Sequence, residues 1–171
     1  MGSVDRANYV PNGRSAYVDS PQLIGCNATI SAPHMHAHAA ELLLPFLNPG
    51  SNVLDVGSGT GYLTAVFHKL VGNGRVTGIE HIEQLSRLGH DNAVRDSLDS
   101  AINSGKLQFV YGDGRNGWAQ NAPYNAIHVG AAAPTVPPSL IEQLSAPGRM
   151  IIPVGDADGQ CVRANQIYLA S

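Results

Sequence analysis

Residues 53–62 read Val53-Leu54-Asp55-Val56-Gly57-Ser58-Gly59-Thr60-Gly61-Tyr62, a hydrophobic run that passes into glycines at every second position. The pattern predicts a buried strand and then a turn that opens a helix, because glycine has no Cβ and adopts backbone conformations closed to other residues. A dinucleotide fingerprint counted from Gly57 would need a glycine at position 62, where the chain has Tyr62. A phosphate-binding P-loop would need a lysine, and the turn has none. The turn therefore favours a nucleoside ligand without phosphates.

A second acidic residue supports the nucleoside interpretation. Residues 75–80 predict the next strand, which ends in Glu80, 25 residues after Asp55. A carboxylate at this place in a βαβ unit accepts hydrogen bonds from ribose hydroxyls. Taken alone, Glu80 fits a solvated strand end equally well. Together with the glycine turn it resembles the cofactor loop of class I methyltransferases, which implies S-adenosyl-L-methionine as the ligand.

Size and composition indicate one globular domain over residues 1–171, with a cofactor-binding core at 50–155. The chain is 43% hydrophobic, carries a net charge of −3 and has no apolar run long enough for a membrane span. Its scattered lysines and arginines argue against a nucleic-acid partner. With no secretory leader, Cys26 and Cys161 are expected to be free thiols. We expect a cytosolic monomer.

Strands and helices alternate along the sequence, which predicts an α/β fold with a parallel sheet, three-layered and Rossmann-like. A helix is expected to begin at Ser31 as its N-cap and to end before Pro49. Residues 1–30 lack periodicity, so we expect a loop or clasp there rather than part of the core. The other predicted helices lie at about 61–71, 82–97 and 137–145, and the predicted strands at 52–56, 75–80, 107–111, 124–129 and 149–154, with one more possible at 165–169.

Polar and glycine residues gather at the predicted carboxyl ends of the strands, where ligands bind in parallel sheets. Asp113 is placed to meet an adenine amino group, although an Asp-Gly pair is as commonly a turn. The residues at these ends are Asp55, Gly57, Glu80, Asp113, Gly114 and Gly130.

Residue spacing argues against two other kinds of site. His34, His36 and His38 invite a metal hypothesis, but only His34 and His38 would share a helix face and no third well-spaced ligand is visible, so no metal is expected. A nucleophile elbow around Ser58 would need glycine at position 56, which is Val56, and this argues against a hydrolase.

The segment after the fourth predicted strand bears on the methyl acceptor. Enzymes that methylate base amino groups carry an Asn/Asp-Pro-Pro-aromatic motif there, whereas residues 128–134 read His-Val-Gly-Ala-Ala-Ala-Pro. Small residues with free backbone groups favour close approach of an extended peptide. A nucleic acid or small molecule as acceptor is the weaker alternative.

Five blocks together resemble one family, the protein-L-isoaspartate O-methyltransferases, over about residues 5–160. The block Ser31-Ala32-Pro33-His34-Met35-His36 is highly specific to that family. The resemblance implies methyl transfer from S-adenosyl-L-methionine to the α-carboxylate of L-isoaspartyl residues in damaged proteins and peptides, which initiates their repair. The blocks are residues 29–37, 54–65, 112–115, 122–133 and 152–155.

The resemblance also implies roles for individual residues. Ser31 is the expected catalytic residue, and a simple N-cap is its competing role. Residues expected to bind the substrate are Ser31, Val129, Gly130 and Ala131. Residues expected to bind the cofactor are Ala28, Thr29, Ile30, Ser31, His36, Asp55, Val56, Gly57, Ser58, Gly59, Thr60, Glu80, His81, Asp113 and Gly114.

The sequence shows no obvious set of residues for a general base, and the proposed reaction needs none. An α-carboxyl group has an ordinary pKa of about 3.5 and is already an anion at neutral pH. Two features depart from the family pattern. Family members extend beyond both ends of the matching region, and residues 159–165 differ from the family sequence. The chain is therefore expected to be truncated at both ends, and the alternative function is an inactive form that binds cofactor or partners without turnover.

Overall fold

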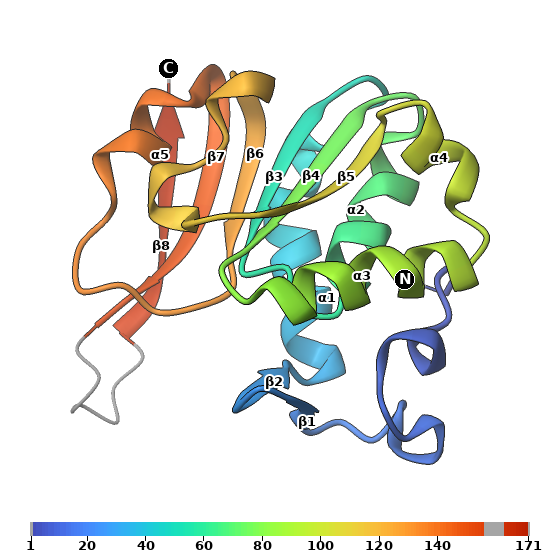
Figure 1. Cartoon of the computed structure of the whole chain (residues 1–171). Helices are drawn as coiled ribbons and strands as arrows, with labels where there is room; N and C mark the ends of the chain where they lie inside the picture. The colour runs from blue at the N-terminus through green and yellow to red at the C-terminus, as the bar shows by residue number, and fades with distance from the viewer. Residues whose placement is uncertain (1, 156–162, 171) are drawn as a thin grey trace.

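The computed structural model describes residues 2–155 and the backbone of residues 163–170. Its centre is a six-stranded sheet in the order β5-β4-β3-β6-β7-β8 (Figure 1). Strands β3 to β7 are parallel, and β8 runs antiparallel to β7 at the edge. The expected strands are all present, while Cys161 lies outside the described residues. The strands are β3 (Asn52–Val56), β4 (Arg75–Glu80), β5 (Leu107–Tyr111), β6 (Tyr124–Val129), β7 (Leu144–Val154) and β8 (Arg163–Ala170).

Helices cover both faces of this sheet, as the three-layer prediction required. Helices α1, α2 and α3 pack on one face, and α5 packs on the other. One helix prediction was wrong in extent, because α5 ends at Glu142 and β7 already begins at Leu144. The short α4 was not predicted. None of the described helices is long and apolar enough to span a bilayer. The helices are α1 (Pro33–Leu43), α2 (Tyr62–Val71), α3 (Glu83–Arg95), α4 (Asp99–Asn103) and α5 (Pro138–Glu142).

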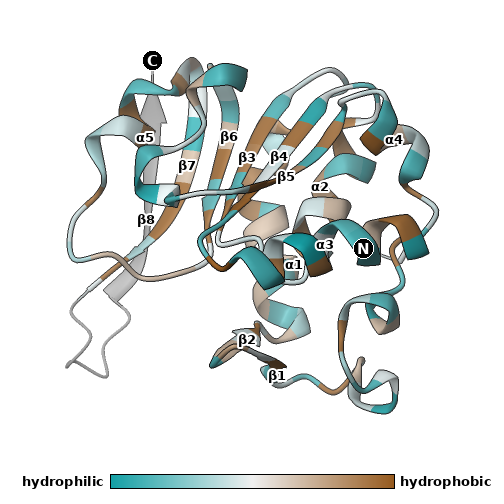
Figure 2. Ribbon diagram, viewed as in Figure 1, coloured by the Kyte–Doolittle hydropathy of each residue, from teal (hydrophilic) through white to brown (hydrophobic). Residues whose placement is uncertain are grey.

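The hydrophobic strands form the core because alternate side chains point to opposite faces of the sheet. Val53, Val76 and Leu107 pack against the side of α1, α2 and α3. Leu54 and Ile79 pack on the other face, against the side of α5. Figure 2 shows brown segments along the central strands and teal segments along the ribbon of α3.

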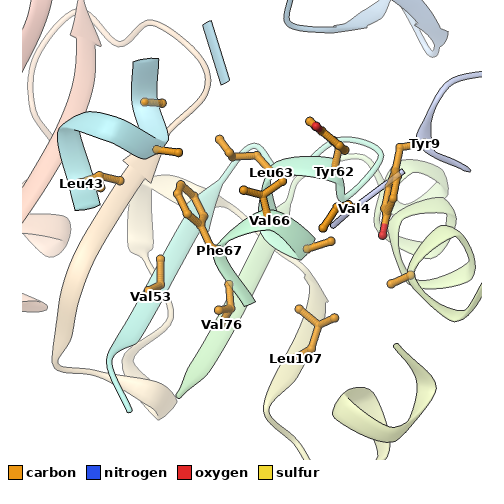
Figure 3. Close-up of a cluster of buried hydrophobic side chains, with 14 of the residues drawn as sticks. Val4, Tyr9, Leu43, Val53, Tyr62, Leu63, Val66, Phe67, Val76 and Leu107 are labelled. Atoms are coloured by element: carbon orange, nitrogen blue, oxygen red, sulfur yellow. The ribbon is translucent and has the colours of Figure 1, made fainter. Parts of the chain in front are cut away.

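The N-terminal segment contributes to the core, so the prediction that it lies outside was wrong. Val4 and Tyr9 are buried beside α2, with Tyr9 packed edge-on against Tyr62 (Figure 3). Helical periodicity is absent here because the segment forms short 3₁₀ helices and a hairpin. These elements are η1 (Arg6–Tyr9), η2 (Gly13–Ser15), β1 (Gln22–Gly25) and β2 (Ala28–Ile30); a further 3₁₀ helix, η3 (Leu44–Phe46), follows α1.

Helix α1 begins one residue later than the sequence suggested. Ala32 is its N-cap, in an extended conformation (φ −59°, ψ 150°), and Pro33 occupies the first turn. Proline disfavours helical backbone in the residue before it, which fixes the boundary at Ala32. The prediction that Ser31 caps the helix was therefore wrong, and its hydroxyl is left for another role.

Candidate functional site

The glycine turn lies at the carboxyl end of β3, and two of its glycines serve different purposes. Gly61 has a φ of +86°, and a Cβ there would lie 2.7 Å from Phe109 Cε1, so close packing requires glycine. Gly57 has a φ of +76°, but a Cβ on it would meet no protein atom within 4 Å. The backbone at Gly57 is therefore open to a ligand.

The carboxylate of Glu80 holds this turn in place. Its Oε2 accepts a hydrogen bond from Gly59 N and its Oε1 accepts one from Ile82 N, both at 3.0 Å. The residue is only 4% exposed. Nδ1 of the exposed His81 lies 3.0 Å from Oε1. Oε2 can accept a further bond, so Glu80 can support the turn and still bind a hydroxyl group.

A cavity of about 530 Å³ opens beside the turn on the α5 side. Its volume lies within the range usual for small-molecule sites. Its lining includes aliphatic residues at the strand ends, Val56, Ile79 and Val129, together with Asp113 and Gly114. The cavity can therefore accept a flat, largely apolar group such as a purine.

Asp113 stands at the rim of this cavity in an ion pair. Its carboxylate accepts the side chain of Arg115 through both oxygens and also Arg115 N. These bonds with Arg115 lower the pKa of Asp113 to about 2, so the group is ionised at neutral pH. The predicted contact with an adenine amino group stays a prediction.

A second, smaller cavity of about 60 Å³ lies under the β1–β2 hairpin, and both cavities are lined by Gly57. Figure 1 shows the hairpin beyond the carboxyl ends of the strands. Ser31 and His36 line the small cavity, as do Ser58 and Thr60. The hydroxyl groups of Ser58 and Thr60 are buried without a hydrogen-bond partner in the described residues. This is a small, polar cavity with unused donors.

A buried network of polar side chains underlies the small cavity. Asp55, 1% exposed, accepts a 2.6 Å hydrogen bond from Thr64 Oγ1 and lies 2.8 Å from His128 Nδ1. Asp55 and His128 are direct neighbours across strands β3 and β6. Both oxygens of Asp55 are thus already hydrogen-bonded within the protein, and the network fixes the orientation of His128 in the wall of the cavity.

His36 is the other ring in this wall, and it is neutral. Burial, with a further contribution from the guanidinium of Arg6, lowers the pKa of His36 to about 3. Arg6 Nη1 lies 3.0 Å from His36 Nδ1, and Arg6 Nη2 donates to the Ser31 carbonyl at 2.7 Å. Ser31 and His36 are therefore held by the same buried arginine.

The structure places the predicted site residues around the two cavities. Ala28 and Glu80 line neither cavity, and Glu80 instead holds the turn through its bond to Gly59 N. Predicted residues that line the small cavity are Thr29, Ile30, Ser31, His36, Asp55, Gly57, Ser58, Gly59, Thr60 and Gly130. Predicted residues that line the large cavity are Val56, Gly57, His81, Asp113, Gly114, Val129 and Ala131.

The segment after β6 and two side chains, His128 and Arg6, differ from what the sequence predicted. The backbone after β6 is less free than expected, because Gly130 N donates to Val56 O and Ala133 N donates to Pro153 O. Between these two residues, Ala131 and Ala132 keep the free backbone N–H groups that were predicted for a peptide-binding segment, since no described residue accepts from them. Sequence reasoning also missed His128, whose signal is a polar residue inside a hydrophobic strand, and Arg6, which has no local signal.

No group of three metal-ligating side chains forms among the described residues, and His34 instead pairs with Asp19 at 2.8 Å.

The fold and the site together define a class of enzyme. A parallel sheet closed by an antiparallel edge strand, with a glycine turn free of phosphate-binding residues and an acid after the next strand, is the arrangement of Rossmann-like class I methyltransferases, which use S-adenosyl-L-methionine.

Comparison with known proteins identifies the family. The sequence model of the protein-L-isoaspartate(D-aspartate) O-methyltransferase family matches residues 1–167, and the chain belongs to this family. The wheat protein-L-isoaspartate O-methyltransferase is 55% identical over 156 residues, which are 91% of this chain and 68% of the wheat protein. The Caenorhabditis elegans enzyme of the same name is 49% identical over 170 residues, 99% of this chain and 72% of its own length.

A solved structure agrees. A Plasmodium falciparum structure described as a protein-L-isoaspartate O-methyltransferase in complex with S-adenosyl-L-homocysteine superposes with a TM-score of 0.86 at 29% identity, covering all of this chain and 85% of that one.

Proposed function

We propose that this protein transfers a methyl group from S-adenosyl-L-methionine to the α-carboxylate of L-isoaspartyl residues in damaged proteins and peptides. The observation that carries the proposal is the meeting of two cavities at Gly57, one of a size and lining that suit a nucleoside and one small and polar. Family membership supports the same reaction.

The residues present fit the cofactor. The open Cβ position at Gly57 allows a ligand to touch the backbone, and Glu80 presents a buried carboxylate to ribose hydroxyls. Asp113 and Gly114 would border the adenine, while Ser58 and Thr60 offer unused hydroxyl groups on the other side of the turn. The bound cofactor would supply an electrophilic methyl group on a sulfonium cation.

The acceptor end needs positioning rather than acid–base chemistry. The α-carboxylate is ionised at neutral pH, so no side chain has to remove a proton before an oxygen attacks the methyl group. Ser31 lines the small cavity, and its hydroxyl makes no hydrogen bond with the described residues. In this proposal that hydroxyl donates to the acceptor carboxylate, and exclusion of water from the small cavity strengthens the contact.

The proposal extends to partners and compartment. The net charge of −3 and the scattered basic residues support protein and peptide substrates over nucleic acid. We also propose that the protein acts as a monomer in the cytosol.

The direct test is transfer of radiolabelled methyl from S-adenosyl-L-methionine to an isoaspartyl peptide, with the normal aspartyl peptide as its matched control. We expect base-labile label on the isoaspartyl peptide alone. Label on both peptides, or on neither when calorimetry shows that S-adenosyl-L-homocysteine binds, would contradict the proposed reaction.

Replacing Ser31 tests the acceptor site. We expect Ser31→Ala to lower kcat/KM for the isoaspartyl peptide by about 10- to 100-fold, the size of one hydrogen bond to a charged group. The affinity for S-adenosyl-L-homocysteine should fall much less. Ser104→Ala serves as control, because Ser104 is exposed and remote at the end of α4. Equal kinetics for the two variants would remove Ser31 from the mechanism.

A further inference from the structure

Arg6 is a buried cation held entirely by neutral groups. It is 3% exposed. Its Nε donates to Ala16 O at 2.8 Å, Nη2 donates to Ser31 O at 2.7 Å, and Nη1 lies 3.0 Å from His36 Nδ1. The guanidinium carbon lies 5.0 Å from the ring centroid of Tyr62. None of these partners carries a negative charge.

No carboxylate within residues 2–155 lies at ion-pair distance from this guanidinium. Asp5 accepts from Ala7 N and Tyr17 Oη, and the exposed Asp19, which attracts Arg6 only through space, accepts from His34. Buried charges are normally paired, because leaving one without a counter-charge is costly. The fold therefore keeps a positive charge next to Ser31 that an anionic ligand can complete.

The contact with Arg6 also fixes the protonation of His36. A guanidinium has donors only, so His36 Nδ1 must accept and the ring proton must be on Nε2. Nε2 makes no hydrogen bond with the described residues, and His36 lines the small cavity together with Ser31. The side chain is thus a neutral ring with one free N–H donor.

We propose that Arg6 is a positioning residue for the acceptor carboxylate: it holds His36 as the Nε2–H form, whose N–H binds one carboxylate oxygen, and its own charge stabilises the anion from behind Ser31. The other carboxylate oxygen stays free to attack the methyl group. This inference rests on the proposed function. It assigns to the small cavity a preference for an anionic group over its amide or ester.

The first test observes His36 directly in the protein without ligand. Two-bond nitrogen–proton NMR spectra of the histidines, with His36 assigned through His36→Gln, should show a proton on Nε2 throughout pH 5 to 8. In Arg6→Met the fixed tautomer should be lost, and the pKa of His36 should rise because the neighbouring positive charge is gone. The groups that still face the ring are Asp55, His128 and Tyr62.

The matched control is Arg149→Met. Arg149 also stacks on an aromatic ring, with its guanidinium carbon 4.9 Å from the Phe46 centroid, and bonds a backbone carbonyl of α1, but it lies outside both cavities. An unchanged His36 spectrum in Arg6→Met, or a spectrum changed equally by Arg149→Met, would overturn the inference.

The second test is kinetic. Arg6→Met should raise KM for the isoaspartyl peptide by about 10- to 100-fold, the range for a charge-assisted contact, while the affinity for S-adenosyl-L-homocysteine changes little. His36 is also among the residues expected to bind the cofactor, so an equal loss of affinity for S-adenosyl-L-homocysteine would show that the anion is the cofactor's own carboxylate and would overturn the inference. Arg6→Lys keeps the charge and should recover part of the loss, and it also serves if Arg6→Met does not fold. Equal losses in Arg6→Lys and Arg6→Met would overturn the electrostatic role. Because the NMR test needs no turnover, a wild-type protein that transfers no methyl would refute the proposed function separately.

Discussion

The carboxylate of Glu80 joins two backbone N–H groups, those of Gly59 and Ile82, across the carboxyl edge of the sheet. Bonds from backbone amides to a buried carboxylate are charge-assisted and therefore strong. A glutamine at this position would keep the shape but turn one acceptor oxygen into an N–H donor. One of the two amides would then face a donor instead of an acceptor.

At this residue we predict that Glu80→Gln weakens binding of S-adenosyl-L-homocysteine by about 10- to 100-fold, because one charged acceptor is lost both to the turn and to the ligand hydroxyls. Isothermal calorimetry measures this directly. Glu83→Gln is the control, since Glu83 is exposed and pairs only with Arg87 along α3. If the two variants bind equally well, Glu80 supports the turn but does not bind the ligand.

Single residues were predictable from sequence where a local motif marks them. Glu80 and Gly57 follow from the spacing of strand, turn and acid, and the structure places both at the turn. Arg6 was not predictable, because its partners Ser31 and His36 are 25 and 30 residues away and no local pattern joins them. His128 gave only the weak signal of one polar residue in a buried strand, and its partner Asp55 is 73 residues away.

At the scale of the element, the strands followed their hydrophobic runs closely, while the boundaries of helices did not. The strands at 52–56, 75–80, 107–111 and 124–129 were predicted within their observed bounds. Helix α1 starts after Ala32 because of the proline that follows, a local rule that outweighed the preference of serine for N-caps. The hairpin β1–β2 escaped prediction because its packing over Gly59, through Ile24, is not local.

The glycine turn offers a matched pair of substitutions at this scale. Gly57 and Gly72 both have positive φ, +76° and +58°, and a Cβ on either would meet no protein atom within 4 Å. Alanine at either position should therefore lower the free energy of unfolding through backbone strain alone, by about 1–2 kcal/mol or more, and the loss should be greater at Gly72, whose ψ of −100° lies outside the left-handed helical region. Only Gly57 lines the cavities. We predict that Gly57→Ala also weakens S-adenosyl-L-homocysteine binding at least tenfold, whereas Gly72→Ala binds normally; urea unfolding and calorimetry separate the two effects. Equal affinities would show that the turn does not touch the ligand.

At the scale of the whole molecule, the site is assembled from segments that lie far apart in sequence. Arg6 comes from η1, His36 from α1, Asp55 from β3 and His128 from β6, and they meet only when the N-terminal segment packs against the sheet and α2. The family resemblance predicted which segments meet, but the burial that keeps His36 neutral is a property of the complete fold. That burial links the site to the stability of the protein.

Because of His36, the free energy of unfolding should decrease as the pH falls. In the folded state the pKa of His36 is lowered to about 3, whereas in the unfolded chain it returns to about 6.5. As the pH falls below 6.5, the unfolded state binds a proton that the folded state refuses, so stability decreases by up to about 1.4 kcal/mol per pH unit. Between pH 7.5 and pH 5 this amounts to about 2 kcal/mol. Carboxylates with lowered pKa, such as Asp19 and Asp113, lose their contribution only below about pH 4, outside this window.

We therefore predict that His36→Gln, although less stable at pH 7.5, loses about 2 kcal/mol less than the wild type when urea unfolding is repeated at pH 5. His68, whose pKa burial also lowers, is present in both proteins and cancels in the difference. His90→Gln is the control, because it removes a histidine that is exposed on α3 and lies outside both cavities. Parallel pH dependence in the wild type and His36→Gln would mean that His36 takes up a proton in the folded protein by pH 5. A protonated His36 has hydrogen on both ring nitrogens, so its Nδ1 could not accept a hydrogen bond from Arg6. The assignment of the proton to Nε2 would then be wrong.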